Sequence, residues 1–498
     1  MLNFLDLVYA ASDARPDNKA ITLKGETLTY RELTAGITNV AANAVAHGAV
    51  SGDRFLFAAK PSPTSIMVTL GLLKAGLTLV FVDPFSSPDL FASRSTLVNP
   101  AYTVADSLLY TLGHPRLARA RAWKNVSVCD YGSVDAGHLF IGRRLPGLPR
   151  AAVSMSDWIR SAPRGVIIPP ADPDADAVIT FTSGTTSDPK GVVHSLGTLS
   201  ANMPVFGALL NLRPGQKIYS EPMTLGAVAL SHGAEWHIPA KTDRVPDADV
   251  YFAVPTVVLA TLDKIEASRR TPLIRTVATG AAPVLPSLVS RISHVLGEST
   301  TILNVYGMTE MLPIAVGDAR LKAQRPTGDL LGTPVGDTEI RIGDNREILV
   351  RGSGLMKRYF GREPAGWHPT GDLGLVDDDG QLVMLGRKKN MLIRGNMNIY
   401  PSLYESSISL IANVEDAVIV GVGDEYGDDV ICLFITVTPG ADAERVRSEV
   451  AKDLVNHMDA DAIPDHVFVI DSIPTSGRAL KRDMGDLHAI AVERLGKL

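Results

Sequence analysis

ITFTSGTTSDPKGVVH, residues 179–194, is the stretch that decides how the rest of the chain is interpreted. An apolar, strand-like run leads into five small residues, Thr182, Ser183, Gly184, Thr185 and Thr186, and Lys190 follows shortly after. Glycine and small hydroxyl residues let backbone N–H and side-chain O–H groups approach phosphate oxygens closely, and the lysine adds a positive charge. A polar surface loop can have the same composition. The strand in front and the Pro-Lys-Gly sequence behind nevertheless favour a phosphate-binding loop.

The spacing of this loop distinguishes it from the P-loop of kinases and NTPases. That motif requires GxxxxGK[ST], in which the lysine directly follows a glycine and a helix begins. Here Pro189 precedes Lys190, and Gly191 comes after it. An unrelated P-loop phosphotransferase is therefore disfavoured.

Strand-like and helix-like segments alternate through most of the chain. Apolar runs predict strands at residues 54–58, 177–181 and 418–422, and amphipathic spacing predicts helices at residues 30–46 and 287–295. Such alternation is typical of α/β architecture with largely parallel sheets.

The pattern changes after residue 339. Short strands between tight turns predict a β-rich subdomain over residues 339–384, and a compact β/α pattern follows. We therefore predict an α/β fold with a large N-terminal domain, residues 1–386, built from two α/β subdomains and the β-rich subdomain. A small mobile α+β C-terminal domain, residues 387–498, completes it.

Composition and charge exclude several classes of protein. Of the 498 residues, 45% are hydrophobic and 20% are charged, and the formal net charge is −6. This balance gives no basic excess for binding nucleic acid or an anionic membrane. The two cysteines, Cys129 and Cys432, are too far apart in sequence to suggest a disulfide framework or a zinc site. The N-terminus lacks the features of a signal peptide, so we expect a cytoplasmic protein.

The most apolar stretch is SIMVTLGLLKAGLTLVFV, residues 65–82. It contains Lys74 and two glycines, and Asp83-Pro84 ends it. A buried helix, a break at glycine and a strand explain this pattern better than a membrane span.

The segment TSGTTSDPKG closely resembles the signature of the adenylate-forming (AMP-binding) superfamily, which includes acyl-CoA synthetases, firefly-type luciferases and the adenylation domains of peptide synthetases. Ser187 stands where the usual form has glycine. Other family segments follow in the family's order, so the resemblance covers essentially the whole chain. They are KAGLTLVFVDP from residue 74, YFAVPTVV from 251, ATGAAPVLP from 278, NVYGMTEM from 304, PTGDLG from 369 and GRKKNMLIRGNMNIYPSLYE from 386.

The resemblance implies a role for each matched residue in joining a carboxylate to the α-phosphorus of ATP. The β- and γ-phosphates would be held by Thr182, Ser183, Gly184, Thr185, Thr186 and Lys190. The adenine would be lined by Gly280, Ala281, Ala282, Tyr306 and Gly307, with Tyr306 stacked on it. The ribose would be bound by Asp372 and Arg387. Thr309 would hydrogen-bond the α-phosphate, and Glu310 would bind Mg²⁺, which prefers oxygen ligands. Lys190 and Thr309 are also predicted to be catalytic, because an ammonium and a hydroxyl donor would stabilise the charge on the reacting phosphates.

The small domain is predicted to rotate about Lys389, which occupies the family's hinge position between the adenylating and thiol-transferring arrangements. The family also supplies a catalytic lysine from a Thr/Ser-Gly-Lys turn in this domain. Here the turn reads PTSGRALKRD, which puts Arg478 at the lysine position and Lys481 three residues later. Arginine keeps the charge but differs in shape. The sequence leaves three interpretations open. Arg478 takes the role of the family's lysine, Lys481 takes it through a shifted loop, or the adenylation half-reaction is slow.

A second departure affects the wall of the acyl pocket. Relatives that make acyl-CoA often carry Pro-x-x-His, but here the unit reads Pro222-Met223-Thr224-Leu225. His232 and His237 lie nearby, and their spacing does not match a HExxH zinc motif. The residues of the pocket segments are small or mid-sized, and they do not distinguish fatty, aryl and polyketide-like acids.

We therefore predict an enzyme that uses ATP and Mg²⁺ to convert a small carboxylic acid into acyl-AMP, and then passes the acyl group to a thiol. Few residues follow Lys481, so we expect the thiol to come from outside the chain, as CoA or as the phosphopantetheine of a separate carrier protein. One alternative is an acyl-AMP ligase that loads a carrier protein or forms a β-lactone. Another is a nucleotide- or acyl-AMP-binding protein with impaired adenylation, which the Arg478 departure suggests.

Overall fold

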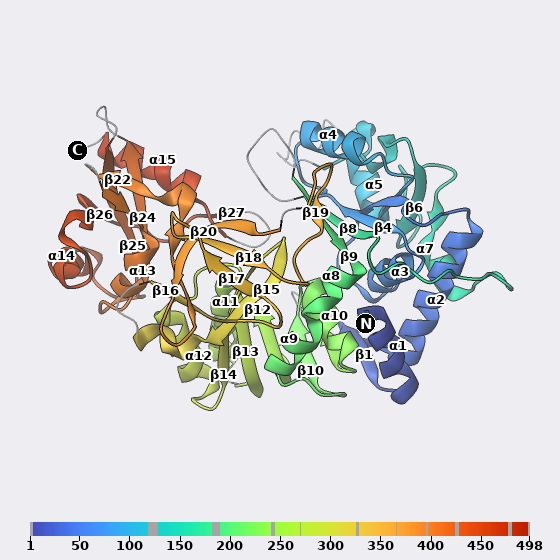
Figure 1. Ribbon diagram of the computed structural model, residues 1–498, viewed down its shortest axis with the longest axis horizontal. Coiled ribbons are helices and arrows are strands. Elements are labelled where there is room, and N and C mark those ends of the chain that lie inside the picture. Colours follow the sequence, from blue (N-terminus) through green and yellow to red (C-terminus); the bar gives the residue numbers. More distant parts are fainter. Residues whose placement is uncertain are drawn as a thin grey trace. The chain divides into compact units, whose positions relative to one another are not determined.

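The computed structural model describes residues 3–117, 128–181, 190–240, 245–268, 270–324, 328–364, 366–394, 397–423, 428–476 and 481–496. Lys389, Met397, Asn398, Asp461 and Lys481 are described by their backbone alone. The chain divides into two compact units. The first contains Met1–Arg244, Thr309–Met311 and Ser353–Ala365, and the second contains Val245–Met308, Leu312–Gly352 and Gly366–Leu498. Figure 1 labels many of the elements of both units.

The first unit contains an eight-stranded sheet. Its strands lie in the order β19 (Arg358–Tyr359), β9 (Gly191–Ser195), β8 (Asp176–Phe181), β4 (Thr78–Phe81), β3 (Arg54–Ala58), β5 (Tyr102–Asp106), β6 (Gly137–Ile141) and β7 (Val153–Ser154). Pairing is parallel from β8 through β7, whereas β9 and β19 run antiparallel to their neighbours. The strands predicted at residues 54–58 and 177–181 are confirmed.

Helices cover this sheet and bury its apolar side chains. Leu56, Val80 and Ile179 share one core with residues of α4 (Pro88–Val98) and α5 (Ser107–Gly113). The helices α2 (Tyr30–Ala46), α3 (Pro63–Lys74) and α7 (Met155–Arg160) pack together on the other side (Figure 1). The apolar stretch from residue 65 is the buried helix α3, a turn at Gly76 (φ +75°) and strand β4, as predicted. Among the described residues, no helix is both long and apolar enough to cross a membrane.

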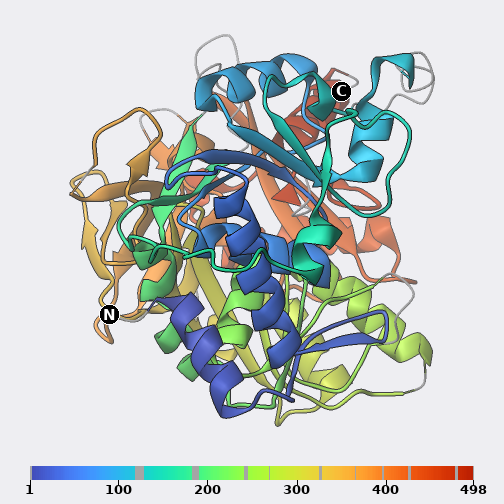
Figure 2. The same ribbon diagram turned by 90° about the vertical axis from the view of Figure 1, so that its right-hand side faces the viewer.

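Four more strands of the first unit lie side by side in the order β10 (Lys217–Ser220), β11 (Glu235–His237), β1 (Lys19–Leu23) and β2 (Glu26–Thr29). The same unit contains the helices α1 (Phe4–Ala14), α8 (Leu196–Ala201), α9 (Met203–Leu209) and α10 (Met223–Ser231). The buried Tyr30 hydroxyl, at the start of α2, donates to the Leu230 and Ala234 carbonyls at 3.0 and 2.9 Å. This places α1 and α2 close to α10, as Figure 2 shows from the side.

The sheet of the second unit is mixed. Its strands lie in the order β17 (Glu339–Ile342), β18 (Glu347–Arg351), β20 (His368–Val376), β21 (Leu382–Arg387), β16 (Asp329–Pro334), β15 (Met311–Asp318), β14 (Thr301–Met308), β13 (Ile274–Gly280) and β12 (Ala248–Ala253). The helices α11 (Pro255–Ser268) and α12 (Pro286–Leu296) pack against each other. Strands β12, β13 and β14 pair in parallel, and the predicted β-rich subdomain adds an antiparallel meander, β17, β18, β20 and β21, to the same sheet.

The C-terminal part of the second unit is an α+β layer, as predicted. The strands β24 (Val414–Gly423), β25 (Asp429–Val437) and β26 (His466–Val469) form a sheet that is buried on both faces. Ile419 and Leu433 pack with α13 (Ser402–Ile408) and α14 (Ala443–Asp453), while Val420 and Phe434 pack with α15 (Met484–Leu495) (Figure 1).

Two short hairpins complete this part, β22 (Leu392–Arg394) with β23 (Met397–Ile399) and β27 (Thr475–Ser476) with β28 (Lys481–Arg482). The second compact unit contains residues 366–498 without a break, so the domain boundary at Gly386 stays a prediction.

Candidate functional site

The predicted phosphate loop connects two strands of the first unit. Strand β8 ends at Phe181, and residues 182–189, which include the predicted phosphate ligands Thr182, Ser183, Gly184, Thr185 and Thr186, lie outside the described residues. Lys190 is exposed and is followed at once by β9. A strand after the lysine, where a P-loop has a helix, agrees with the exclusion of that motif by spacing.

The Thr309-Glu310 turn belongs to the same unit, and three hydrogen bonds hold it. His194 Nε2 lies 2.9 Å from the Thr309 carbonyl, the Met356 N–H donates to the Glu310 carbonyl at 2.7 Å, and the Tyr359 hydroxyl donates to Glu310 Oε1 at 2.7 Å. Glu310 is buried, with 7% of its surface exposed, while Thr309 is exposed. The turn therefore combines an accessible hydroxyl with a carboxylate that is fixed at one oxygen.

His194 is a functional candidate that the sequence analysis did not single out. Because a carbonyl can only accept, Nε2 carries the proton, and Nδ1 lies 3.0 Å from the Thr198 hydroxyl. Burial lowers the pKa of the His194 imidazole, which keeps the ring neutral and in this tautomer. Its place on a buried strand just after Lys190 was a signal that could have revealed it.

In the second unit, the predicted ribose ligands lie together. The Tyr306 hydroxyl donates to Asp372 Oδ2 at 2.8 Å, and Arg387 Nε lies 3.0 Å from Asp372 Oδ1. Asp372 and Arg387 are also cross-strand partners on β20 and β21. Burial, and then the charge of Asp372, raise the pKa of Tyr306 far above its ordinary range, so the hydroxyl stays a donor. Asp372 is thus a buried carboxylate with a partner at each oxygen.

The small residues predicted beside adenine follow strand β13. Gly280 pairs with Val305 on β14, and a Cβ added to Gly280 would lie 2.0 Å from the Val305 carbonyl oxygen. Ala281 is exposed and has a left-handed backbone (φ +64°), which costs energy for a residue other than glycine. Ala282 and Gly307 are half-buried. Close packing of two strands therefore requires glycine at 280, whatever binds nearby.

Substituting alanine for Gly280 is expected to lower the free energy of unfolding by about 3 kcal/mol or more, because the obstructing atom belongs to a paired backbone. Urea unfolding of the purified variant measures this. Gly423→Ala, at the end of β24 where an added Cβ meets nothing within 4 Å, is the matched control and should change stability by less than about 1 kcal/mol. Equal stability of the two variants would contradict the packing argument.

Two of the three predicted C-terminal residues, Lys389 and Lys481, lie on described backbone. Arg478 lies outside the described residues, Lys481 begins β28, and the predicted hinge residue Lys389 lies in a short 3-10 helix, Lys388–Asn390. Next to Lys481, Arg482 donates from Nη1 to Glu405 Oε2 at 2.9 Å and from Nη2 to Asp416 Oδ1 at 2.5 Å. The hairpin is therefore fastened to α13 and β24.

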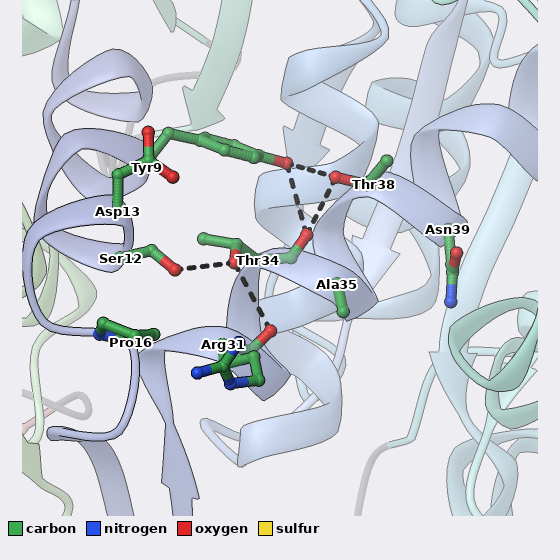
Figure 3. Close-up of a pocket in the computed structure, with 9 residues that line it drawn as sticks. All are labelled: Tyr9, Ser12, Asp13, Pro16, Arg31, Thr34, Ala35, Thr38 and Asn39. Carbon is green, nitrogen blue, oxygen red and sulfur yellow. Dashed lines mark hydrogen bonds between the residues drawn. The ribbon is translucent and has the colours of Figure 1, made fainter.

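A shallow hollow of about 520 Å³ lies between α1 and α2 in the first unit. Figure 3 shows that its side chains largely bond to one another, including Ser12 with Thr34 at 3.0 Å and Tyr9 with Thr38 at 2.6 Å. None of the predicted site residues lines it. We assign it no role in catalysis.

Comparison with known proteins identifies two family profiles in this chain. The profile of the AMP-binding enzyme family matches residues 8–360, and that of the AMP-binding enzyme C-terminal domain matches residues 404–479. Feruloyl-CoA synthase of Amycolatopsis sp is 25% identical over 514 residues, covering 94% of this chain and 96% of that protein. Long-chain-fatty-acid–CoA ligase of Bacillus subtilis (strain 168) is 24% identical, covering 88% and 86%.

Solved structures share the fold along the whole chain. The amide bond synthetase McbA from Marinactinospora thermotolerans superimposes with a TM-score of 0.80 at 22% identity, covering 98% of this chain and 99% of that one. The predicted α/β architecture, with its large N-terminal part and small C-terminal part, is thereby confirmed. Because the profile of the AMP-binding enzyme family matches residues 8–360, well over half of the sequence, this chain belongs to the AMP-binding enzyme family.

Proposed function

We propose that this enzyme activates a small carboxylic acid with ATP to form acyl-AMP and pyrophosphate, and then transfers the acyl group to the thiol of CoA. The observation that carries the proposal is the Thr309-Glu310 turn. It pairs an exposed hydroxyl with a buried carboxylate, and it belongs to the same compact unit as Lys190. Reaction between a carboxylate and a phosphate requires such groups, because charge accumulates on the phosphate oxygens.

The residues of this turn fit a magnesium ion. Glu310 offers a carboxylate oxygen, which is the donor type that Mg²⁺ prefers, and its Oε1 is fixed by the Tyr359 hydroxyl. When bound, Mg²⁺ neutralises phosphate charge. In our proposal Thr309 donates to the α-phosphate, and Lys190 with the loop residues 182–186 binds the departing pyrophosphate.

We assign the nucleoside end of ATP to residues of the second unit. Asp372, supported by Arg387 and Tyr306, would accept hydrogen bonds from the ribose hydroxyls, since each carboxylate oxygen can accept more than one. Tyr306 and Gly307, with residues 280–282, would lie along the adenine.

The C-terminal part, residues 387–498, would supply the bridging cation, either Arg478 or Lys481, after rotation about Lys389. Fastening of the β27–β28 hairpin by Arg482 supports this, because a bridging cation needs a fixed backbone. The relatives named as CoA ligases support CoA as the acceptor. The departure at Arg478 favours a second candidate, a nucleotide-binding protein with slow adenylation.

Carboxylate-dependent exchange of labelled pyrophosphate into ATP tests the proposal. A panel of fatty, aryl and dicarboxylic acids should give exchange with one class, and thioester formation should then require CoA. Arg478→Ala and Lys481→Ala, assayed alongside, identify the bridging cation as the one whose loss abolishes exchange. Transfer to a holo carrier protein or lactone release without CoA would redirect the second step. ATP binding without exchange for any acid would support the second candidate.

A further inference from the structure

A short segment of the first unit, residues 356–360, connects the strand after the phosphate loop with the Thr309-Glu310 turn. Strand β19 in this segment pairs with β9, with Tyr359 opposite Val192. The Phe360 N–H donates to the Gly191 carbonyl at 2.7 Å, and the Lys357 N–H donates to the Val193 carbonyl at 2.8 Å. The segment is therefore bound to the residues that directly follow Lys190.

Ion pairs fasten the same segment to the strand before the loop. Asp176, at the start of β8, accepts from Lys357 Nζ at 3.0 Å and from Arg358 Nη1 and Nη2 at 2.9 and 2.7 Å. Burial alone would raise the pKa of Asp176, but these cations hold it below its ordinary value. Both strands that flank the loop are thus tied to residues 356–360.

Tyr359 is the residue of this segment that makes contact with both predicted ligands. Its hydroxyl donates to Glu310 Oε1 at 2.7 Å, and its ring centroid lies 5.6 Å from Lys190 Nζ, within the range of a cation–π contact. A tyrosine hydroxyl is protonated at neutral pH and a carboxylate oxygen can only accept, so Tyr359 is the donor of this bond.

We propose that Tyr359 is a positioning residue that fixes the Glu310 carboxylate for nucleotide-bound Mg²⁺ and sets it in register with Lys190. The inference deepens the proposed function and rests on it. One hydroxyl bond leaves Oε1 occupied and selects one rotamer of a carboxylate that would otherwise sample several. Hydrogen bonds to metal-ligating carboxylates typically change metal affinity about 10- to 100-fold when they are lost.

The contact with Lys190 acts on a different part of the nucleotide. The lysine ammonium rests near the face of the Tyr359 ring, which limits its range without neutralising its charge. The Tyr359 hydroxyl thus positions Glu310, the predicted metal ligand, and the Tyr359 ring positions Lys190, the predicted phosphate ligand. Two substitutions can separate these effects.

The test measures binding of MgATP, and of ATP in excess EDTA, by isothermal titration calorimetry. Tyr359→Phe keeps the ring and loses the hydroxyl, so we expect MgATP to bind about tenfold more weakly while ATP in EDTA binds as to the unmodified enzyme. In the exchange assay the same variant should need about tenfold more Mg²⁺ for half-maximal rate, with a smaller change in the rate at saturating Mg²⁺. Tyr359→Leu removes the ring as well, and should also weaken binding of ATP in EDTA.

Tyr404→Phe is the matched control, because the Tyr404 hydroxyl also donates to a carboxylate, Asp459 Oδ2, at 2.7 Å. It should leave the Mg²⁺ requirement unchanged. An unaltered Mg²⁺ requirement in Tyr359→Phe, in an enzyme that otherwise exchanges pyrophosphate, would overturn the positioning role alone. If Tyr359→Phe lost stability and weakened both forms of ATP equally, a structural role would replace it. Absence of MgATP binding and exchange in the unmodified enzyme would instead reject the proposed function.

Discussion

Replacing Glu310 by glutamine is expected to slow carboxylate-dependent ATP–pyrophosphate exchange on the order of 10²–10³-fold, since the predicted magnesium ligand loses its charge. Glutamine has nearly the same size, and its carbonyl oxygen can still accept the hydroxyl of Tyr359. The bonds from His194 and Met356 go to backbone carbonyls of the turn, so they do not involve the Glu310 side chain. The change therefore removes charge while leaving the fold in place.

The measurement is the exchange rate over a range of Mg²⁺ concentrations, together with the free energy of unfolding. Glu339→Gln is a suitable control, because that glutamate forms an exposed ion pair with Arg351 on β17 and β18. Exchange by Glu310→Gln within a few-fold of the unmodified enzyme would show that Glu310 is not the metal ligand. A large loss of stability would mean that its charge serves the fold instead.

Arg482→Met is expected to lower the free energy of unfolding by roughly 3–5 kcal/mol, the usual cost of removing one partner from a buried ion pair. The Arg482 side chain is 15% exposed and lies between Glu405, which is 10% exposed, and Asp416. Methionine fills much of the volume, but the two carboxylates lose their counter-charge. Glu405 Oε1 also accepts from the Ile419 N–H at 3.0 Å, so this carboxylate of α13 is held against the backbone of β24.

The loss should depend on pH in a defined direction. Burial raises the pKa of Glu405 even in the presence of Arg482, and removing the arginine raises it further. A carboxyl whose folded pKa is raised destabilises the fold above that pKa and not below its ordinary value of 4.5. The deficit of Arg482→Met relative to the unmodified chain should therefore shrink as the pH falls toward about 4.5 and be full at neutral pH.

Urea unfolding at several pH values measures both effects. Arg447→Met, which breaks an exposed pair with Glu444 on α14, should cost less than about 1 kcal/mol and show no such pH dependence. The double variant Arg482→Met with Glu405→Gln should recover part of the loss. If it recovers nothing, packing of the arginine stem rather than charge accounts for the effect.

Local patterns predicted much of the fold. The strands at residues 54–58 and 177–181 and the helix at residues 30–46 were readable because each buries a regular set of apolar side chains. The motif residues Tyr306, Asp372 and Arg387 were identified by resemblance, and the second unit brings them together. What resemblance did not supply was the direct bond from the Tyr306 hydroxyl to Asp372.

The contacts that fix the candidate ligands were not predictable in the same way. Strand β19 has two residues, too few for any periodicity, and it pairs with β9 from a distant part of the sequence. Tyr359 therefore looked like one more residue of the β-rich segment, although it belongs to the first unit. The cluster of Arg482 with Glu405 and Asp416 likewise joins residues more than sixty positions apart. Sequence spacing carries no record of such pairings.

The first compact unit is built from three separate stretches of the sequence, which limits where the protein can be divided into fragments. A fragment that ends at residue 244 would contain β9 but neither the Thr309-Glu310 turn nor β19, both of which the later sequence delivers. The outer edge of β9 would then expose unpaired backbone groups, which invite pairing between chains. Recombination at a single point between two relatives would likewise combine a phosphate loop from one parent with the supporting segment of the other. The phosphate loop and the segment that supports it must therefore come from the same parent sequence.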